Sequence, residues 1–154
     1  MGCDIHIHAE RREDDHWAYI PMEGEPLGSR SYGVFGFLAN VRNYSAIRPI
    51  AMPRGFPEDA SECVRAAYAS WEGDSHTPSW LTVQELTDYD YDMQIEDRRY
   101  TRQEEPGFFN GGATCEAGQG KTLPLREFLG ANFFKELERL RASGAERIVF
   151  WFDN

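Results

Sequence analysis

The chain of 154 residues carries 16 basic and 26 acidic side chains, which gives a formal net charge of −10 at pH 7. With 41% hydrophobic residues it has enough apolar material for one ordinary core, which argues against a disordered protein and predicts a single domain over residues 1–154. The negative charge, without any run of Lys or Arg, argues against duplex nucleic acid as a partner.

Residues 3 to 20 have the pattern of a β-hairpin. Apolar residues occupy every odd position from Cys3 to Ala9, while the even positions from Asp4 to Glu10 are polar. This two-residue period is typical of a strand with one buried face. Residues 11–16 are charged turn material, and residues 17–20 predict a short second strand.

Three helices are predicted in the middle of the chain. Residues 31–41 have apolar positions at helical spacing. A second helix is expected over residues 59–71, where Asp59 with Glu62 resembles a capping box, and a third over residues 83–86, which follow a second capping box. Residues 73–80 between these two helices are expected to form a turn.

The last third of the chain predicts one helix and one buried strand. Residues 89–95 alternate in a strand-like way, and residues 103–120 are glycine-rich and predict a long loop. A helix is expected from Pro124 to Gly144, followed by a buried strand over residues 147–152. The predicted fold is α+β, with a small, mainly antiparallel sheet that includes both terminal strands side by side and helices packed on one face.

The polar face of the first strand is the strongest candidate for a metal site. Alternate positions of a strand share a face, so two imidazoles and two carboxylates lie within reach of one ion, and imidazole favours Zn, Mn or Fe. A solvated sheet face remains the alternative reading. The proposed metal ligands are Asp4, His6, His8, Asp74 and His76.

His6 and His76 are expected to belong to one site, because each is the imidazole nearest a carboxylate in its own segment. Glu10 or Asp153 would then act as the general base in catalysis. The repeated aspartates from Asp88 to Asp92 resemble a calcium loop, but Met93 replaces its glycine, so no calcium site is expected there.

Three arginines that flank turns containing Gly or Pro predict a site for an anionic ligand, with an ordinary surface salt bridge as the alternative for each. Basic residues are almost all arginine, whose planar guanidinium suits phosphate or carboxylate. An aromatic ring at such a site can stack on a base. The candidate ligand-binding residues are Arg30, Tyr32, Arg42, Arg54, Ser79 and Trp80.

Three widely spaced cysteines without a C-x-x-C pair argue against a disulfide framework, so a cytoplasmic location is expected. No window approaches the roughly 18 apolar residues of a membrane span, and no membrane partner is expected. The oligomeric state stays open, a homo-oligomer included.

Several blocks of the sequence resemble a family of small, functionally uncharacterised bacteriophage and prophage proteins, which begin Met-(Gly)-Cys-Asp-Ile-His and end Phe-Trp-Phe-Asp-Asn. The matching blocks are Met1–His6, Phe35–Arg42, Pro53–Asp59, Asp74–Leu81 and Phe150–Asn154. The resemblance implies a phage-encoded accessory protein in the host cytoplasm and transfers no chemistry. Small phage proteins of this kind commonly act on host defence.

Three functions are compatible with the sequence. The first is a metal-dependent hydrolase of a phosphoester or nucleotide signal. The second is a non-catalytic binder that sequesters a small anionic nucleotide ligand to counter host defence. The third is an acidic inhibitor of another protein, which only the acidic composition supports.

Overall fold

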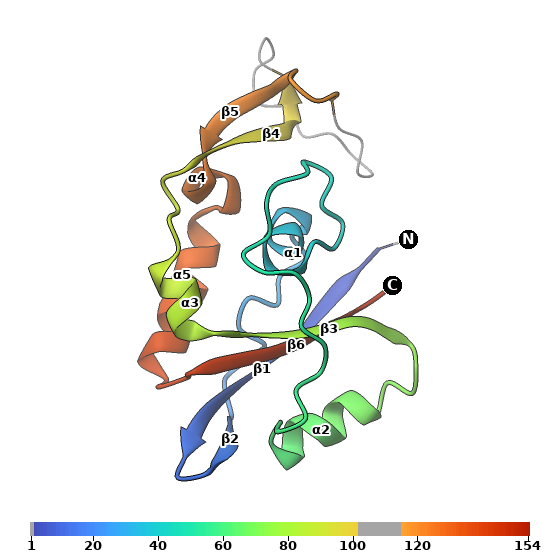
Figure 1. The fold of residues 1–154 in the computed structure, drawn as a ribbon, viewed down its shortest axis with the longest axis vertical. Coiled ribbons are helices and arrows are strands. Elements are labelled where there is room, and N and C mark those ends of the chain that lie inside the picture. The colour runs from blue at the N-terminus through green and yellow to red at the C-terminus, as the bar shows by residue number, and fades with distance from the viewer. Residues whose placement is uncertain (1, 102–114) are drawn as a thin grey trace.

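A four-stranded antiparallel sheet forms the centre of the computed structural model, which describes residues 2–101 and 115–154. Its strands are β1 (Asp4–Glu13), β2 (His16–Ile20), β3 (Ser75–Thr82) and β6 (Arg147–Asp153), in the order β2-β1-β6-β3 (Figure 1). The expected hairpin of β1 and β2 is confirmed, as is the pairing of the two terminal strands. Asp4 lies opposite Asp153 in this pairing.

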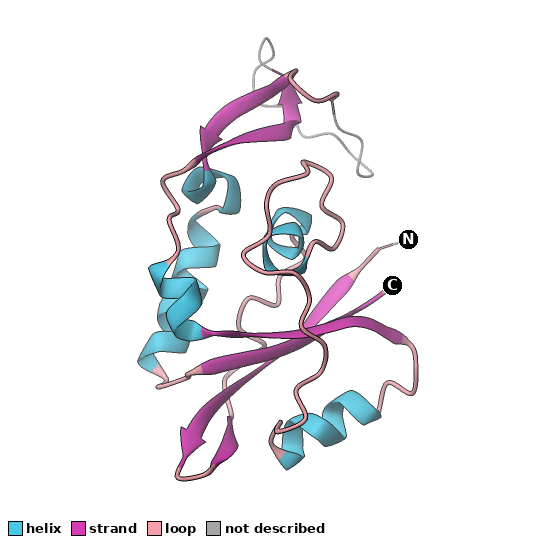
Figure 2. Cartoon of the chain, in the orientation of Figure 1, coloured by secondary structure: helices cyan, strands magenta, loops and turns pink. Residues whose placement is uncertain are grey.

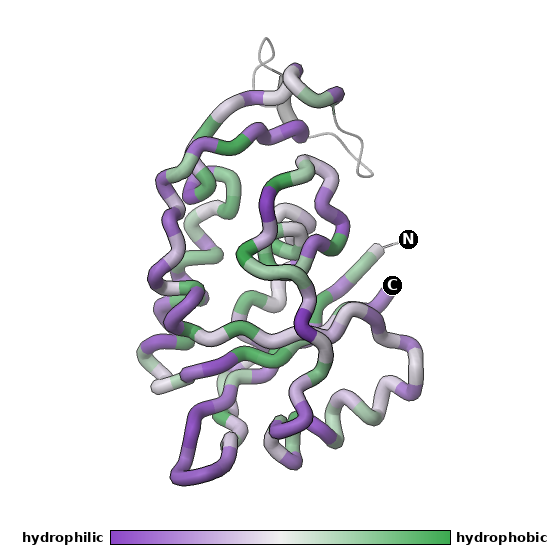
Figure 3. Tube along the Cα trace, viewed as in Figure 1, coloured by the Kyte–Doolittle hydropathy of each residue, from purple (hydrophilic) through white to green (hydrophobic). Residues whose placement is uncertain are grey.

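Strand β6 is buried on both faces of the sheet, as its continuous apolar sequence predicts. Its six residues from Arg147 to Phe152 are all buried. In Figure 3, coloured by hydropathy, most of this stretch is hydrophobic, whereas the tip of the β1–β2 hairpin is hydrophilic. Each face of β6 must therefore pack against other elements of the fold.

The larger core lies on one face of the sheet, beneath α1 (Tyr32–Ala39), α3 (Val83–Asp88) and α5 (Ala131–Ala142) (Figure 2). The odd positions of β1 point into it, together with Phe150 and Phe152 of β6. Phe35 of α1 packs edge-on against Phe152, with ring centroids 5.2 Å apart. This face agrees with the α+β fold expected from the sequence.

Helix α2 (Glu62–Ala69) lies on the opposite face of the sheet, which differs from the expectation that all helices share one face (Figure 1). There Val64 packs in a smaller core with Val149 and Trp151, the outward-facing residues of β6. Trp151 is fully buried, and a large indole on this face needs a covering element. Apolar residues at both odd and even positions of β6 indicate that both faces of the strand are buried, and hence that a second covering layer exists.

A second, two-stranded sheet stands apart from the first and consists of β4 (Gln94–Thr101) and β5 (Gly120–Pro124) (Figure 1). Strand β5 was not predicted. Residues 89–93 precede β4 as a turn, yet Tyr89, Tyr91 and Met93 pack into the larger core as their alternation indicated. The predicted loop over residues 103–120 lies largely outside the described residues.

Several helix boundaries differ from the predictions. Helix α2 begins after Ser61, whose side chain caps Val64, because the Asp59 carboxylate bonds to Arg147 and Trp17 instead. The capping box that opens α3 is confirmed. The last helix is divided at Gly130 into α4 (Leu125–Leu129) and α5, and none of the described helices could cross a lipid bilayer.

The segment expected to form a turn at residues 73–80 is mostly strand β3. It pairs with β6 and contains an irregularity between His76 and Ser79, where Thr77 has a φ of 52°. The Pro and Ser residues of this segment favour turns locally, but pairing with β6 stabilises the strand. This tertiary contact decides which way its side chains face.

Candidate functional site

The polar residues of β1 share one face of the sheet, as predicted, but their neighbours on β6 place them in separate surroundings. His6 lies opposite Trp151, and Glu10 lies opposite Arg147. Two groups of side chains result, one at each end of the sheet. We call them the terminal cluster and the Trp–Arg ladder.

The terminal cluster is organised around His6. Its Nε2 lies 2.6 Å from Asp153 Oδ2, and its Nδ1 lies 3.6 Å from Glu25 Oε1. The imidazole ring also packs against Trp71, with centroids 4.4 Å apart. The His6 side chain is 21% exposed, so a paired imidazole and carboxylate reach the surface here.

Arg30 adds a guanidinium to the terminal cluster. It donates two hydrogen bonds to Asp4, at 2.8 and 2.7 Å, and this contact lowers the pKa of the Asp4 carboxyl. Both Asp4 oxygens are thereby engaged, which leaves this carboxylate poorly suited to hold a metal. Arg30 in turn is largely neutralised by Asp4.

Two tyrosines complete the terminal cluster. The Tyr32 hydroxyl accepts a hydrogen bond from the Cys3 backbone N–H at 3.1 Å, and Arg42 stands 5.4 Å from the centre of the Tyr32 ring. Arg42 also donates to the Tyr44 hydroxyl at 3.2 Å. The cluster thus joins six sequence-predicted site residues: Asp4, His6, Arg30, Tyr32, Arg42 and Asp153.

His8 is not part of the terminal cluster. Its ring stacks on Trp151 at a centroid distance of 5.0 Å and an angle of 14°. Its Nδ1 is buried and has no hydrogen-bond partner within the described part of the chain. Burial, followed by the nearby His6, lowers the pKa of His8, so this imidazole is held in its neutral form.

His76 lies on the opposite face of the sheet from His6, so the prediction of one shared site is wrong. His76 pairs with Phe152 and stacks on its ring at 6.0 Å, whereas His6 pairs with Trp151. Successive residues of β6 face opposite sides, and this parity separates the two imidazoles. His76 instead contacts Thr77 and Asn154, each at 2.9 Å.

The predicted metal ligands are therefore divided among several places. Asp74 is exposed in the turn before β3, where its backbone N–H donates to the Trp71 carbonyl at 2.9 Å. Among residues 2–101 and 115–154, no group of three or more His, Cys, Asp or Glu side chains is arranged to hold an ion. The aspartates near residue 90 have separate partners: Gln84 for Asp88, the Asp92 backbone for Asp90, and Arg126 for Asp92.

Glu10, predicted as a general base, has a structural role at the other end of the sheet. It is fully buried, and its Oε1 accepts hydrogen bonds from Arg147 at 2.9 and 2.6 Å. Its Oε2 accepts from the Ser61 backbone at 2.7 Å. Both oxygens are occupied away from solvent, so Glu10 cannot reach a substrate and instead positions Arg147.

Arg147 is the middle of the Trp–Arg ladder, a row of alternating guanidinium and indole groups across the sheet. Its guanidinium lies 4.0 Å from the centre of the Trp17 ring and 5.9 Å from that of Trp80. Such contacts are favourable cation–π interactions. The five members of the ladder are Arg12, Trp17, Arg147, Trp80 and Arg54.

The predicted ligand-binding residues Arg54, Ser79 and Trp80 meet at one end of the ladder. Arg54 stands 4.5 Å from the Trp80 ring centre and forms an ion pair with Glu85, which lowers the pKa of Glu85 to about 2. The buried Ser79 hydroxyl accepts from the Arg54 backbone at 2.9 Å. Ser79 and Arg54 therefore hold Trp80 in place rather than facing a ligand.

An open cleft of about 510 Å³ lies beside the ladder. Its volume falls within the roughly 300–1,000 Å³ of small-molecule sites. Both indoles of the ladder line it, and Trp17 is fixed by a hydrogen bond from Nε1 to Asp59 at 3.1 Å. The full lining is Arg12, Trp17, Pro57, Glu58, Asp59, Trp80 and Arg147.

No protein-family model, functionally described protein or solved structure matches this chain. Trp17, Arg12 and Arg147 were missed as site residues from the sequence. Arg147 could have been found from the predicted pairing of the two terminal strands, because that pairing places it opposite Glu10.

Proposed function

We propose that this protein binds a small anionic nucleotide ligand in the cleft between Trp17 and Trp80. The observation that carries this proposal is a cleft of small-molecule size with two indoles and an exposed arginine in its wall. Aromatic rings and guanidinium planes are the surfaces on which nucleobases stack. A base placed here would contact the ladder.

Arg12 is the residue proposed to take the phosphate. It stands 5.6 Å from the Trp17 ring centre, is exposed, and has no carboxylate partner among the described residues. Arg147 is unsuited to that role because Glu10 and Asp59 neutralise it. It keeps the two indoles at their positions.

The charge around the cleft favours a small ligand over a polymer. Glu58 and Asp59 line the same cleft, and the whole chain carries a net charge of −10. These charges repel a long phosphate backbone, whereas a ligand with few phosphates meets Arg12 at short range. The proposal therefore concerns a nucleotide rather than a nucleic acid.

Titration calorimetry with AMP, GMP, CMP and UMP, combined with tryptophan fluorescence, tests the proposal. Loss of a charge-assisted hydrogen bond costs roughly 1.5–3 kcal/mol, so Arg12→Ala should weaken binding by about 10- to 150-fold. Trp80→Ala should remove binding. The same affinity for Arg12→Ala as for the unaltered protein, or no binding of any of the four nucleotides, would refute the proposal.

Matched controls separate the cleft from the rest of the surface. Arg11→Ala removes the neighbouring arginine, whose guanidinium is paired with Glu13, and should leave binding unchanged. Trp71→Phe alters an indole of the terminal cluster and should also have no effect. Arg11→Ala changes the net charge as Arg12→Ala does, and Trp71→Phe removes one indole as Trp80→Ala does.

A metal-dependent hydrolase acting on a phosphoester is the second candidate, favoured by the partly exposed His6–Asp153 pair. An imidazole held by a carboxylate suits proton transfer, and the ion pair of Arg30 with Asp4 lies in the same cluster. Elemental analysis of the purified protein distinguishes the two functions. Stoichiometric zinc, manganese or iron that is lost in His6→Ala would favour the hydrolase.

The resemblance to phage and prophage proteins suggests a purpose for ligand binding. A phage protein that sequesters a nucleotide signal would lower its free concentration in the host and so counter a defence that depends on it. Sequestration needs no catalysis, only tight binding and sufficient protein. This reading rests on the resemblance together with the cleft.

A further inference from the structure

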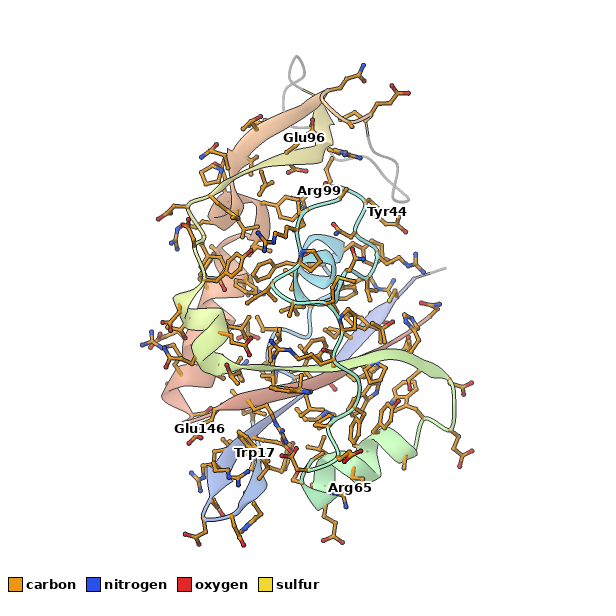
Figure 4. The ribbon with its side chains drawn as sticks, in the orientation of Figure 1. Trp17, Tyr44, Arg65, Glu96, Arg99 and Glu146 are labelled. Atoms are coloured by element: carbon orange, nitrogen blue, oxygen red, sulfur yellow. The ribbon has the colours of Figure 1, made fainter. Side chains whose placement is uncertain are left out.

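Trp17 forms a wall between two hollows. The cleft described above lies on the side of Trp80, and a second open hollow of about 600 Å³ shares the Trp17 indole. Figure 4 shows Trp17 close to Glu146, another residue of the second hollow, at the end of the sheet away from the termini. Besides Trp17 and Glu146, the second hollow is lined by Val83, Gln84 and Arg141 among others.

The wall between the hollows is held in place. Trp17 donates to Asp59 through Nε1, and Arg147 packs on its ring at 4.0 Å. The backbone N–H of Glu146 donates to the backbone carbonyl of Glu10, and the Glu146 carbonyl accepts from the backbone N–H of Val83, both at 2.9 Å. The two hollows are thus fixed neighbours with a common indole.

We infer that the ligand is a dinucleotide, with one base in each hollow and the linking phosphate crossing the edge of Trp17. This inference rests on the proposed function of the first cleft. Each hollow alone falls in the size range of a small-molecule site, so a ligand with one base fills only half of the available surface. Linking two bases makes the second contact intramolecular.

The polar groups of the second hollow suit a nucleotide. Gln84 donates its amide N–H to Asp88 at 2.7 Å, which leaves its amide oxygen as an acceptor for a base. Arg141 places a half-exposed guanidinium in this hollow, where it also donates to the Glu138 carboxylate at 3.1 Å. Each hollow therefore combines the shared Trp17 indole with an exposed arginine, Arg12 in the first hollow and Arg141 in the second.

Each hollow also contains a carboxylate that limits the charge of the ligand. Glu58 and Asp59 line the first hollow and Glu146 lines the second. A triphosphate in either hollow brings several negative charges close to these carboxylates, whereas a dinucleotide spreads one or two phosphodiester charges over both hollows. The arrangement therefore favours two bases with few phosphates over one base with many.

Calorimetry on the full chain tests this inference with the base that binds best as a mononucleotide. The probes are the mononucleotide, its triphosphate, the linear dinucleoside monophosphate and the cyclic dinucleotide. One of the two dinucleotides should bind at least about tenfold tighter than the mononucleotide, and the triphosphate should bind more weakly than that dinucleotide. Which one is tighter identifies the linear or the cyclic form.

Arg141→Ala should weaken dinucleotide binding about tenfold and leave mononucleotide binding unchanged. Lys135→Ala on the same helix removes an exposed cation outside both hollows and should change neither affinity. Far-UV circular dichroism of each variant checks that the fold is kept.

Equal affinity for mononucleotide and dinucleotide would overturn the inference while leaving the proposed function intact. An equal loss of both affinities in Arg141→Ala would overturn it as well, because the second hollow would then not be a separate subsite. Failure of every probe to bind would overturn the proposed function itself. The three results are distinguishable in a single set of titrations.

Discussion

Replacement of Glu10 by Ala should destabilise the protein strongly, because it leaves the Arg147 guanidinium buried without its main counter-charge. Arg147 is 3% exposed, and the substitution removes two hydrogen bonds from it and one from Ser61. Breaking a buried ion pair from one side costs roughly 3–5 kcal/mol. Asp59 still accepts one bond from Arg147 at 2.8 Å, so we expect a loss of about 3 kcal/mol, at the lower end of that range.

Urea unfolding followed by far-UV circular dichroism measures this loss. A domain of this size is stable by roughly 5–15 kcal/mol, so the variant should remain folded in the absence of urea. Glu13→Ala breaks the exposed Arg11–Glu13 pair and should cost less than about 1 kcal/mol. If Glu10→Ala loses no more stability than Glu13→Ala, the ladder does not depend on a buried ion pair and this reasoning is wrong.

Two further predictions concern Glu85 and Gly130. Hydrogen bonding from Arg54 lowers the pKa of Glu85 from 4.5 to about 2, so ionised Glu85 stabilises the fold above pH 4.5, and this contribution is lost as the pH falls towards 2. Urea unfolding at a series of pH values should therefore show the stability difference between the unaltered protein and Glu85→Gln shrinking over that interval, and a difference that stays constant would contradict the assigned pairing. Gly130 joins α4 to α5 with φ 88° and ψ 163°, a conformation nearly restricted to glycine, so Gly130→Ala should cost roughly 1–3 kcal/mol. An unchanged thermal midpoint for Gly130→Ala would show that this junction relaxes without strain.

The central strand pair could be predicted because its signal is local. The alternation from Cys3 to Ala9 and the apolar run that ends at Phe152 each specify a strand without reference to the rest of the chain. Pairing them followed from the need of a buried strand for neighbours. The capping box of α3 could also be predicted from sequence, because only Thr82 and Glu85, three residues apart, form it.

Strand β3 could not be predicted, because its state depends on a distant partner. Its sequence contains Ser, His, Thr and Pro, which favour turns, and only pairing with β6 makes it a strand. This one difference also moved His76 to the opposite face from His6. A predicted site that joins side chains from two segments therefore depends on the strand register of both, and the register of β3 is set only by its pairing with β6.

The Trp–Arg ladder was missed for a related reason. Its members come from the β1–β2 hairpin, from β6, from β3 and from the segment before α2, and no sequence spacing relates them. Arg54 and Trp80 were recognised by residue type, but their neighbours Trp17 and Arg147 follow only from the strand order. The terminal cluster shows the same limit, since Arg30 and Arg42 reach Asp4 and Tyr32 from irregular segments.

The position of β6 between β1 and β3 has a consequence for how the chain folds. The contact of His6 with Asp153 spans 147 residues, so the central pairing closes a very long loop. Sheets dominated by such distant pairings fold slowly compared with those built from local hairpins. Until β6 docks, β1 and β3 are not joined in one sheet and the apolar side chains of both strands lack part of their core, so a partly folded chain exposes apolar surface that favours aggregation.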